Sequence, residues 1–290
     1  MRVSVVIPTY FRGQDLARLL DSLLEQTVKP MEVIIIDDTP ISEIRQLVKD
    51  HIIVSRRANV DLIYIENPKE RSITIARNIG VKMAKGDIVL FLDSDLVLYP
   101  DFIQGLLKTY EGHPEAVGVT GWIVPTTHVK DIRYCSFETL RKLFLLFHAS
   151  GDSFSFFEYP ISLTKTVVCQ RFSGANMSYR RSLFTEFEFD ENLKGYAYME
   201  DALFSGSVYE KYPGKLLMTP DAKCTHSFSQ EGRMEKSKLR YLKLRNRKYV
   251  LTKLFGAKGL LMFGWENFGL LIIRLIGRIR KNRDITDQFL

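Results

Sequence analysis

Two carboxylates separated by one residue, Asp93 and Asp95, directly follow the strand-like segment 87–92. In an extended chain, residues two apart point the same way, so both carboxylates can face one side. Oxygen ligands in this arrangement can share a divalent cation with the oxygens of a diphosphate. The triplet Asp93-Ser94-Asp95 also suits a capped turn, and by itself it supports the two interpretations about equally.

Other polar residues could bind the rest of such a ligand. Asp37-Asp38 ends a second apolar segment, where a carboxylate can accept hydrogen bonds from a base or ribose, although a turn or helix cap is the commoner role. Arg71 and Arg77 flank the start of the next amphipathic segment. Both could pair with phosphate or with the aspartates, but arginines on helices are more often solvated or salt-bridged.

Glu200 and Asp201 are adjacent carboxylates near the start of an expected helix. When an acceptor hydroxyl attacks an anomeric carbon it must lose its proton, and a carboxylate opposite the leaving group can accept that proton. Because the two side chains project differently, only one of them can face such a site. A structural role at the positive N-terminus of the helix is equally compatible with the sequence.

Two further segments carry small or nitrogen-containing residues. Gly174-Ala175-Asn176 is expected to precede a helix, where small residues let backbone amides approach a sugar, although a tight turn explains Gly174 as well. His226 follows the expected strand 215–218 after a short loop. A lone histidine is more often structural than a ligand.

These residues lie between segments that alternate in character. Short β-branched runs predict strands, and leucine-rich amphipathic segments predict helices. Apolar strands separated by such helices indicate a parallel sheet covered on both faces, with ligands at the carboxyl ends of the strands. The expected strands are 3–8, 32–37, 61–65, 87–92 and 215–218, and the expected helices are 15–26, 41–49, 72–84, 198–212 and 234–254.

Five segments, in this order and spacing, resemble the family 2 inverting glycosyltransferases of the GT-A fold: VSVVIPTY, IIIDD, IARNIGVKMAKGDIVLFLDSD, FSGANMSYRR and YMEDALFS. The resemblance covers about residues 1–230. It implies an α/β catalytic domain with a mostly parallel central sheet flanked by helices, a nucleotide-binding part of about 1–125 and an acceptor part of about 126–230. Residues 231–290 would then form a basic, amphipathic helical extension.

The resemblance also implies roles for individual residues. The reaction would move a sugar from a nucleotide-diphospho-sugar, most simply a UDP-sugar, to an acceptor hydroxyl. A histidine ligand would favour Mn²⁺ over Mg²⁺ without excluding Mg²⁺. Phe11 departs from the pattern, since many relatives have Asn after the Tyr, so contacts to the base are expected to differ. The implied residues are Pro8, Thr9, Tyr10 and Asp38 at the base and ribose; Arg71 and Arg77 at the uracil or diphosphate; Asp93, with Ser94, at the ribose or metal; Asp95 and His226 at the metal; Asn176 at the donor sugar; and Asp201, beside Glu200, as general base.

The segment 125–165 has no clear period and many aromatic residues, so we expect it to shape the acceptor site. The three cysteines are far apart and form no Cys-x-x-Cys pair, which predicts neither a disulfide framework nor a zinc knuckle. The first residues run directly into a strand without a signal-like apolar stretch, so a cytoplasmic location is expected.

The charge of the chain is polarised. The formal net charge is +7, but residues 233–283 alone carry +13 and the remainder −6. Such a basic end suits an anionic partner. No helix-turn-helix, zinc-finger or RNP pattern accompanies the charge, so nucleic acid is an unlikely partner.

The apolar stretch 259–277 is interrupted by charged residues and falls short of a membrane-spanning helix. Its apolar residues share one helical face and basic residues follow, which suits a helix on the inner face of the cell membrane through 255–283, near a glycan or lipid-linked acceptor. A core-packing helix with a solvated basic end is an equal alternative. The residues of that face are Leu261, Trp265, Phe268, Ile272 and Leu275.

Two other functions use a similar sheet. A sugar-phosphate nucleotidyltransferase usually needs a Gly-rich loop after the first strand, and residues 8–13 form a poor one. A non-catalytic nucleotide-binding module of the same fold is disfavoured by the presence of Asp95, Asp201 and His226. A nicotinamide-dependent dehydrogenase is disfavoured because no G-x-G-x-x-G follows the first strand. The sequence does not indicate the oligomeric state.

Overall fold

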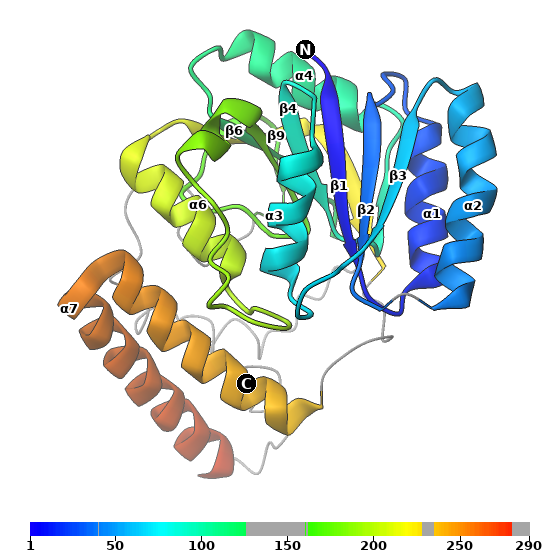
Figure 1. Cartoon of the computed structure of the whole chain (residues 1–290). Coiled ribbons are helices and arrows are strands. Elements are labelled where there is room, and N and C mark those ends of the chain that lie inside the picture. The colour runs from blue at the N-terminus through cyan, green and yellow to red at the C-terminus, as the bar shows by residue number, and fades with distance from the viewer. Residues whose placement is uncertain (40, 126–159, 161, 228–234, 280–290) are drawn as a thin grey trace.

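The computed structural model describes residues 1–39, 41–125, 160, 162–227 and 235–279 (Figure 1). A nine-stranded sheet forms its centre, in the order β3-β2-β1-β4-β8-β6-β9-β5, with β7 paired to β9. The first four strands in this order are parallel, as the apolar runs predicted. They are β3 (Asp61–Glu66), β2 (Glu32–Asp37), β1 (Val3–Thr9) and β4 (Ile88–Leu92).

The other half of the sheet is mixed. β8 is antiparallel to β4 and to β6, β9 is parallel to β6, and β5 and β7 are antiparallel to β9. The expected α/β fold with a central sheet flanked by helices is confirmed, and the antiparallel strands are an addition to it. Their bounds are β8 (Asn176–Arg180), β6 (Gly118–Ile123), β9 (Leu216–His226), β5 (Leu96–Leu98) and β7 (Val167–Val168).

Residues 176–180 are a strand, so the helix expected to begin near Asn176 is wrong. Met177 and Tyr179 join one apolar core, while Ser178 on the other face donates to the backbone oxygen of Val119 at 2.5 Å. Successive side chains therefore point to opposite faces of β8, as expected for a strand that pairs with β4 on one side and β6 on the other. The short helix η2 (Arg181–Thr185) follows only afterwards.

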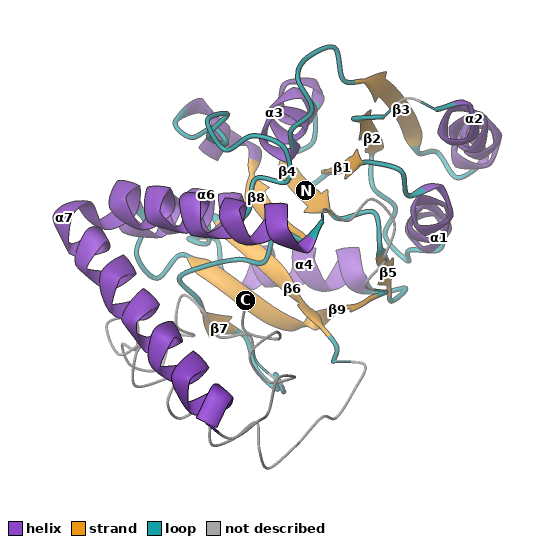
Figure 2. Ribbon diagram, turned by 90° about the horizontal axis from the view of Figure 1, so that it is seen from below, coloured by secondary structure: helices purple, strands orange, loops and turns teal. Residues whose placement is uncertain are grey.

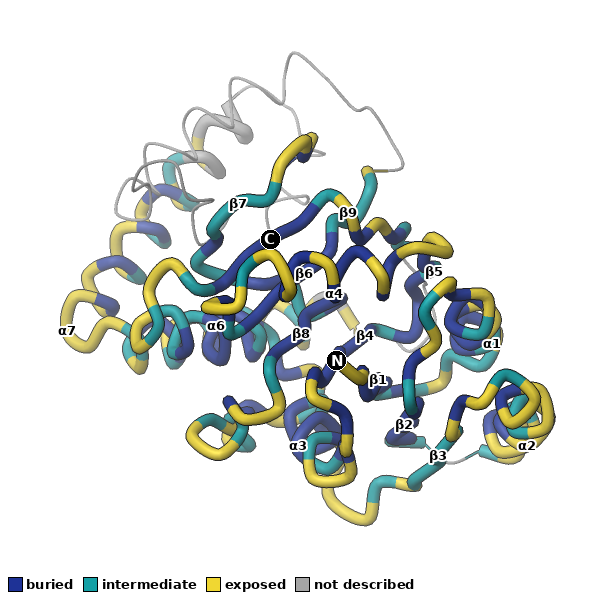
Figure 3. The backbone as a smooth tube through the Cα atoms, turned by 90° about the horizontal axis from the view of Figure 1, so that it is seen from above, coloured by how far each residue is buried: buried dark blue, intermediate teal, exposed yellow. Residues whose placement is uncertain are grey.

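Helices cover both faces of the sheet (Figures 2 and 3). Successive side chains of each central strand point to opposite faces, so each strand contributes to two cores. One core packs β1 side chains Val5 and Ile7 against α1, α2 and α4, and the other packs Val6 against α3 and α6. The helices are α1 (Gly13–Leu24), α2 (Ser42–Arg57), α3 (Ile73–Met83), α4 (Phe102–Gly112) and α6 (Glu200–Lys211).

The C-terminal helix α7 (Lys236–Ile279) consists of two arms that meet at Gly256, whose φ of 57° allows the chain to fold back (Figure 1). The first arm packs on the region of α6: Val250 is buried there, and Lys253 lies 2.5 Å from Asp190 Oδ2. Gly259 lies against the backbone of Leu251, so the two arms approach closely. Among the described helices, none is both long and apolar enough to cross a bilayer.

Candidate active site

Asp95, Arg12 and His226 form one charged group, called here the outer cluster, at the carboxyl edge of the sheet. Pairing of β5 with β9 sets Leu96 opposite His226 and so brings His226 beside Asp95. His226 Nε2 donates to Asp95 Oδ1 at 3.0 Å, and Arg12 Nη1 lies 2.9 Å from Asp95 Oδ2. The arginine and histidine side chains are 22% and 19% exposed. Solvent therefore reaches this cluster through its two basic members.

The outer cluster favours an ionised Asp95. Burial raises the pKa of this carboxyl. The hydrogen bond from His226 and the nearby charges of His226 and Arg12 together lower the pKa by more than burial raises it, so the net shift is downward. Arg12 was not expected from the sequence. The signal that could have identified Arg12 is its position in the loop between β1 and α1, just past the carboxyl end of a predicted strand.

A second charged group, the inner cluster, is centred on Arg77, whose side chain is buried together with that of Glu200, while Asp93 at its edge is 30% exposed. Arg77 is 0% exposed and donates to Glu200 Oε1 and, at 2.8 Å, to the backbone oxygen of Gly174. Asp93 Oδ1 lies 3.5 Å from Arg77 Nη2. Burial raises the pKa of Glu200 to about 7; the positive charge of Arg77 opposes that rise and the negative charge of Asp201 adds to it.

Asp201 occupies the first turn of α6, next to Glu200, and has different hydrogen-bond partners. Its Oδ2 accepts from the Gly174 amide at 2.9 Å and its Oδ1 from the Ala202 amide at 2.8 Å. The carboxylate is 16% exposed. The residue before the helix, Met199, has a φ of 68°, a left-handed conformation often found near functional sites. The two adjacent carboxylates therefore have different surroundings, as their spacing required.

The loops after β1 and β2 meet beside these clusters. The Asp38 amide donates to Thr9 O at 3.0 Å, and Asn67 Nδ2 donates to Asp38 Oδ1 at 2.5 Å. The guanidinium of Arg71 lies 3.3 Å from the centroid of the Tyr10 ring. Pro8, at the end of β1, is half-buried beside them. Burial outweighs these hydrogen bonds and raises the pKa of Asp38.

Some predicted residues lie inside the fold. Ser94 is 3% exposed, and Asn176 is 0% exposed with Oδ1 accepting from Thr120 Oγ1 at 2.6 Å and from the Gly121 amide at 2.8 Å. Asn176 thus bonds within the sheet, which differs from the expected contact with a donor sugar. The aromatic residues expected at the acceptor site between 126 and 159 lie outside the described residues.

Asp95 and His226 offer one oxygen and one nitrogen ligand, a donor set that fits a divalent transition metal. Asp93 turns instead toward Arg77. Within the described part of the chain, no group of three or more His, Cys, Asp or Glu side chains is arranged to hold a metal ion.

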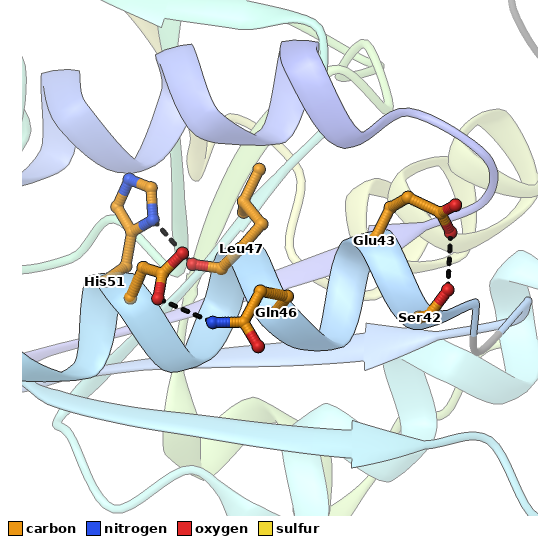
Figure 4. A pocket seen from close by; sticks show the side chains of 6 residues that line it. Ser42, Glu43, Gln46, Leu47 and His51 are labelled. Atoms are coloured by element: carbon orange, nitrogen blue, oxygen red, sulfur yellow. Dashed lines mark hydrogen bonds between the residues drawn. The ribbon is translucent and has the colours of Figure 1, made fainter.

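A surface cavity of about 600 Å³ lies along α2, away from both clusters (Figure 4). Its polar side chains already have partners, for example Gln46 Nε2 with Asp50 Oδ1 at 2.8 Å and His51 Nε2 with Asp21 Oδ1 of α1 at 3.3 Å. None of the residues predicted for the site lines it. The lining residues are Ser42, Glu43, Gln46, Leu47, Asp50 and His51.

Comparison with known proteins gives the class of enzyme. Residues 4–187 match the family described as glycosyl transferase family 2. The chain belongs to this family, and the protein is a glycosyltransferase with a GT-A fold.

Among curated relatives, the chain is 26% identical over 234 residues to a glucosyl-dolichyl phosphate glucuronosyltransferase of Haloferax volcanii, covering 78% of this chain and 69% of the relative. It is also 26% identical over 273 residues to the uncharacterized glycosyltransferase YwdF of Bacillus subtilis, covering 94% and 90%. It spans only 28% of the glycosyltransferase GlyA of Streptococcus pneumoniae.

Solved structures show the same fold. The mannosyltransferase PcManGT from Pyrobaculum calidifontis, in complex with GDP-Man and Mn²⁺, has a TM-score of 0.61 at 16% identity, covering 94% of this chain and 75% of that one. TarS of S. aureus in complex with UDP has a TM-score of 0.57 at 20% identity, covering 91% and 70%.

Proposed function

We propose that this glycosyltransferase moves a sugar from a nucleotide-diphospho-sugar, a UDP-sugar in the first instance, to an acceptor hydroxyl with inversion at the anomeric carbon. The observation that carries the proposal is the outer cluster, in which Arg12 and His226 both contact Asp95 at the carboxyl edge of the sheet. The solved relatives that bind GDP-Man with Mn²⁺ or UDP support it.

In this proposal, each group at the edge has a separate task. Asp38 and Tyr10, with Pro8 and Thr9 behind them, bind the base and ribose. Asp95 and His226 would hold Mn²⁺ or Mg²⁺, whose charge stabilises the departing diphosphate. Arg12, which pairs with Asp95, adds positive charge on the same side. Arg77 is fully buried, so it positions Asp93 and Glu200 and does not touch the donor.

Asp201 would act as the general base. The acceptor oxygen attacks the anomeric carbon on the face opposite the diphosphate, the bond from that carbon to the leaving oxygen breaks, and Asp201 takes the hydroxyl proton. The amides of Gly174 and Ala202 fix the carboxylate in place while it stays partly exposed. Displacement from the opposite face inverts the configuration.

The test is turnover of UDP- and GDP-sugars in the presence of Mn²⁺. Release of nucleoside diphosphate is expected, and Asp201→Asn should lower it at least 100-fold, in the range for a lost general base. Asp95→Ala should also lose turnover, because a metal ligand is removed. Release of pyrophosphate would instead indicate a nucleotidyltransferase, and nucleotide binding without any turnover would indicate a non-catalytic module. Full activity of both variants would contradict the assigned roles.

The arm of α7 after Gly256 supports a lipid-linked acceptor at an anionic membrane surface. Its one acidic residue among the described positions, Glu266, is 4% exposed and pairs with Arg247 at 2.6 Å. The outward side carries leucines instead, with Leu261 75%, Leu271 51% and Leu275 50% exposed. Such a face, next to a basic arm, suits the boundary of an anionic leaflet. The relative from Haloferax volcanii is named for a dolichyl phosphate substrate.

Vesicle partitioning tests this part of the proposal. The protein should bind vesicles that contain anionic lipid, and the double variant Leu261→Ser, Leu271→Ser should bind them less because apolar area is lost. Ile53→Ser is the matched control, since Ile53 is 60% exposed on α2. Equal partitioning of wild type and double variant would rule out the membrane role.

A further inference from the structure

The loop between β1 and α1 holds an aromatic residue in an unfavourable backbone conformation. Phe11 has a φ of 55°, in the left-handed region that a bulky residue rarely adopts. Its side chain is nevertheless 43% exposed. Burial of the ring therefore does little to offset the cost of the backbone conformation, which is the kind of local strain that gathers at ligand sites.

The residues on either side of Phe11 in the chain contact two different parts of the edge. On one side, the Tyr10 ring lies 4.6 Å away, centroid to centroid, at an angle of 74°. Thr9, one residue earlier, bonds to Asp38. On the other side, Arg12 pairs with Asp95. Phe11 thus links the loop that faces Asp38 to the cluster that faces the diphosphate.

The Tyr10 ring is already occupied by a partner. The guanidinium of Arg71, 3.3 Å from the ring centroid, lies over one face of it, and Phe11 meets it edge to face. Among the described residues of this loop, Phe11 presents the more open aromatic surface, since Tyr10 is only partly exposed. A planar base stacks on such a surface whatever its identity, because every base has a π-face.

We infer that Phe11 is the stacking platform for the base of the nucleotide, an inference that rests on the proposed function. Phe11 stands in the chain between Tyr10, which its ring meets edge to face, and Arg12, which pairs with Asp95. A purely structural ring that only covers Tyr10 would contribute to stability and not to nucleotide affinity. The two roles therefore predict opposite results for one substitution.

The experiment compares wild type with Phe11→Asn by calorimetric titration of UDP and GDP at fixed Mn²⁺, and of pyrophosphate as a probe without a base. Asparagine adopts the left-handed conformation more readily than phenylalanine, so the melting temperature of the unliganded variant should be equal or higher. The Kd of the tighter nucleotide should rise roughly tenfold, as for a lost aromatic stack on a base. The Kd of pyrophosphate should not change.

Two further variants complete the design. Phe11→Trp should keep nucleotide affinity because it keeps a ring, and Tyr241→Ala should have no effect, since Tyr241 is 70% exposed on the first arm of α7. An unchanged nucleotide Kd in Phe11→Asn, or an equal loss of pyrophosphate affinity, would overturn the stacking role while leaving the proposed function in place. Failure of the wild type to bind either nucleotide would overturn both.

Discussion

The outer and inner clusters use the same residue types in opposite surroundings. In the outer cluster, Arg12 is 22% exposed, and the pKa of Asp95 is lowered because its basic neighbours outweigh its burial. In the inner cluster, Arg77 is 0% exposed, and the pKa of Glu200 is raised to about 7 because burial outweighs its basic neighbour. An arginine beside a carboxylate therefore does not indicate ligand binding by itself. Access to solvent separates the pair that can exchange partners with a ligand from the pair that maintains the fold.

The largest expected difference between the clusters is in stability. Arg77→Met would leave Glu200 buried without its cation, and loss of one partner of a buried pair costs about 3–5 kcal/mol of unfolding free energy. Arg12→Met should cost less, because Arg12 is 22% exposed and Asp95 keeps its bond to His226. Urea unfolding of both variants measures the contrast. Equal losses would show that the clusters do not differ in this way.

The next prediction concerns pH. Below pH 4.5, Glu200 is protonated in both the folded and the unfolded chain; between pH 4.5 and about 7 the unfolded chain loses the proton and the folded chain keeps it. The free energy of unfolding should therefore fall as pH rises through this window, on the order of 3 kcal/mol in total. Glu200→Gln should lower the slope by this amount, as measured by urea unfolding between pH 4.5 and 8. Parallel curves for the two proteins would contradict the raised pKa.

A smaller effect is expected at the joint between the inner cluster and Asp201. A methyl group at position 174 would lie 3.0 Å from Glu200 Oε1 and 3.2 Å from Arg77 Nη2. Gly174→Ala should thus cost about 1–3 kcal/mol by overpacking. Gly112→Ala, with no atom within 4 Å of the added carbon, should be neutral or stabilising by up to about 1 kcal/mol. An unchanged free energy of unfolding in Gly174→Ala would mean that Glu200 and Arg77 can shift to make room for the methyl group.

The strands of the parallel half of the sheet could be predicted because each of them is a continuous apolar run in the sequence. The run Glu32–Asp37 is buried throughout and matches the predicted strand end for end. The antiparallel strand β8 could not be read in this way, because residues 176–180 are mixed in polarity and become a strand by pairing with β4. Local propensity gives way to tertiary pairing in such segments.

The site was predicted unevenly for the same reason. Resemblance to the family pointed to His226, and the pairing of Leu96 with His226 explains how it reaches Asp95 across 131 positions. The burial of Arg77 against Glu200, 123 positions apart, follows from how α3 and α6 pack and leaves no local pattern. The bond between Arg12 and Asp95 likewise depends on how the loop after β1 turns. The roles assigned to these residues remain predictions.

The most direct test of the account is a thermal-shift measurement of wild type and Asp95→Asn with UDP, each with and without Mn²⁺. A ligand that binds only the folded state raises the melting temperature by mass action. UDP should stabilise the wild type more when Mn²⁺ is present, and Asp95→Asn should lose that Mn²⁺-dependent increment. An increment of the same size in both proteins would show that Asp95 does not hold the metal under the diphosphate.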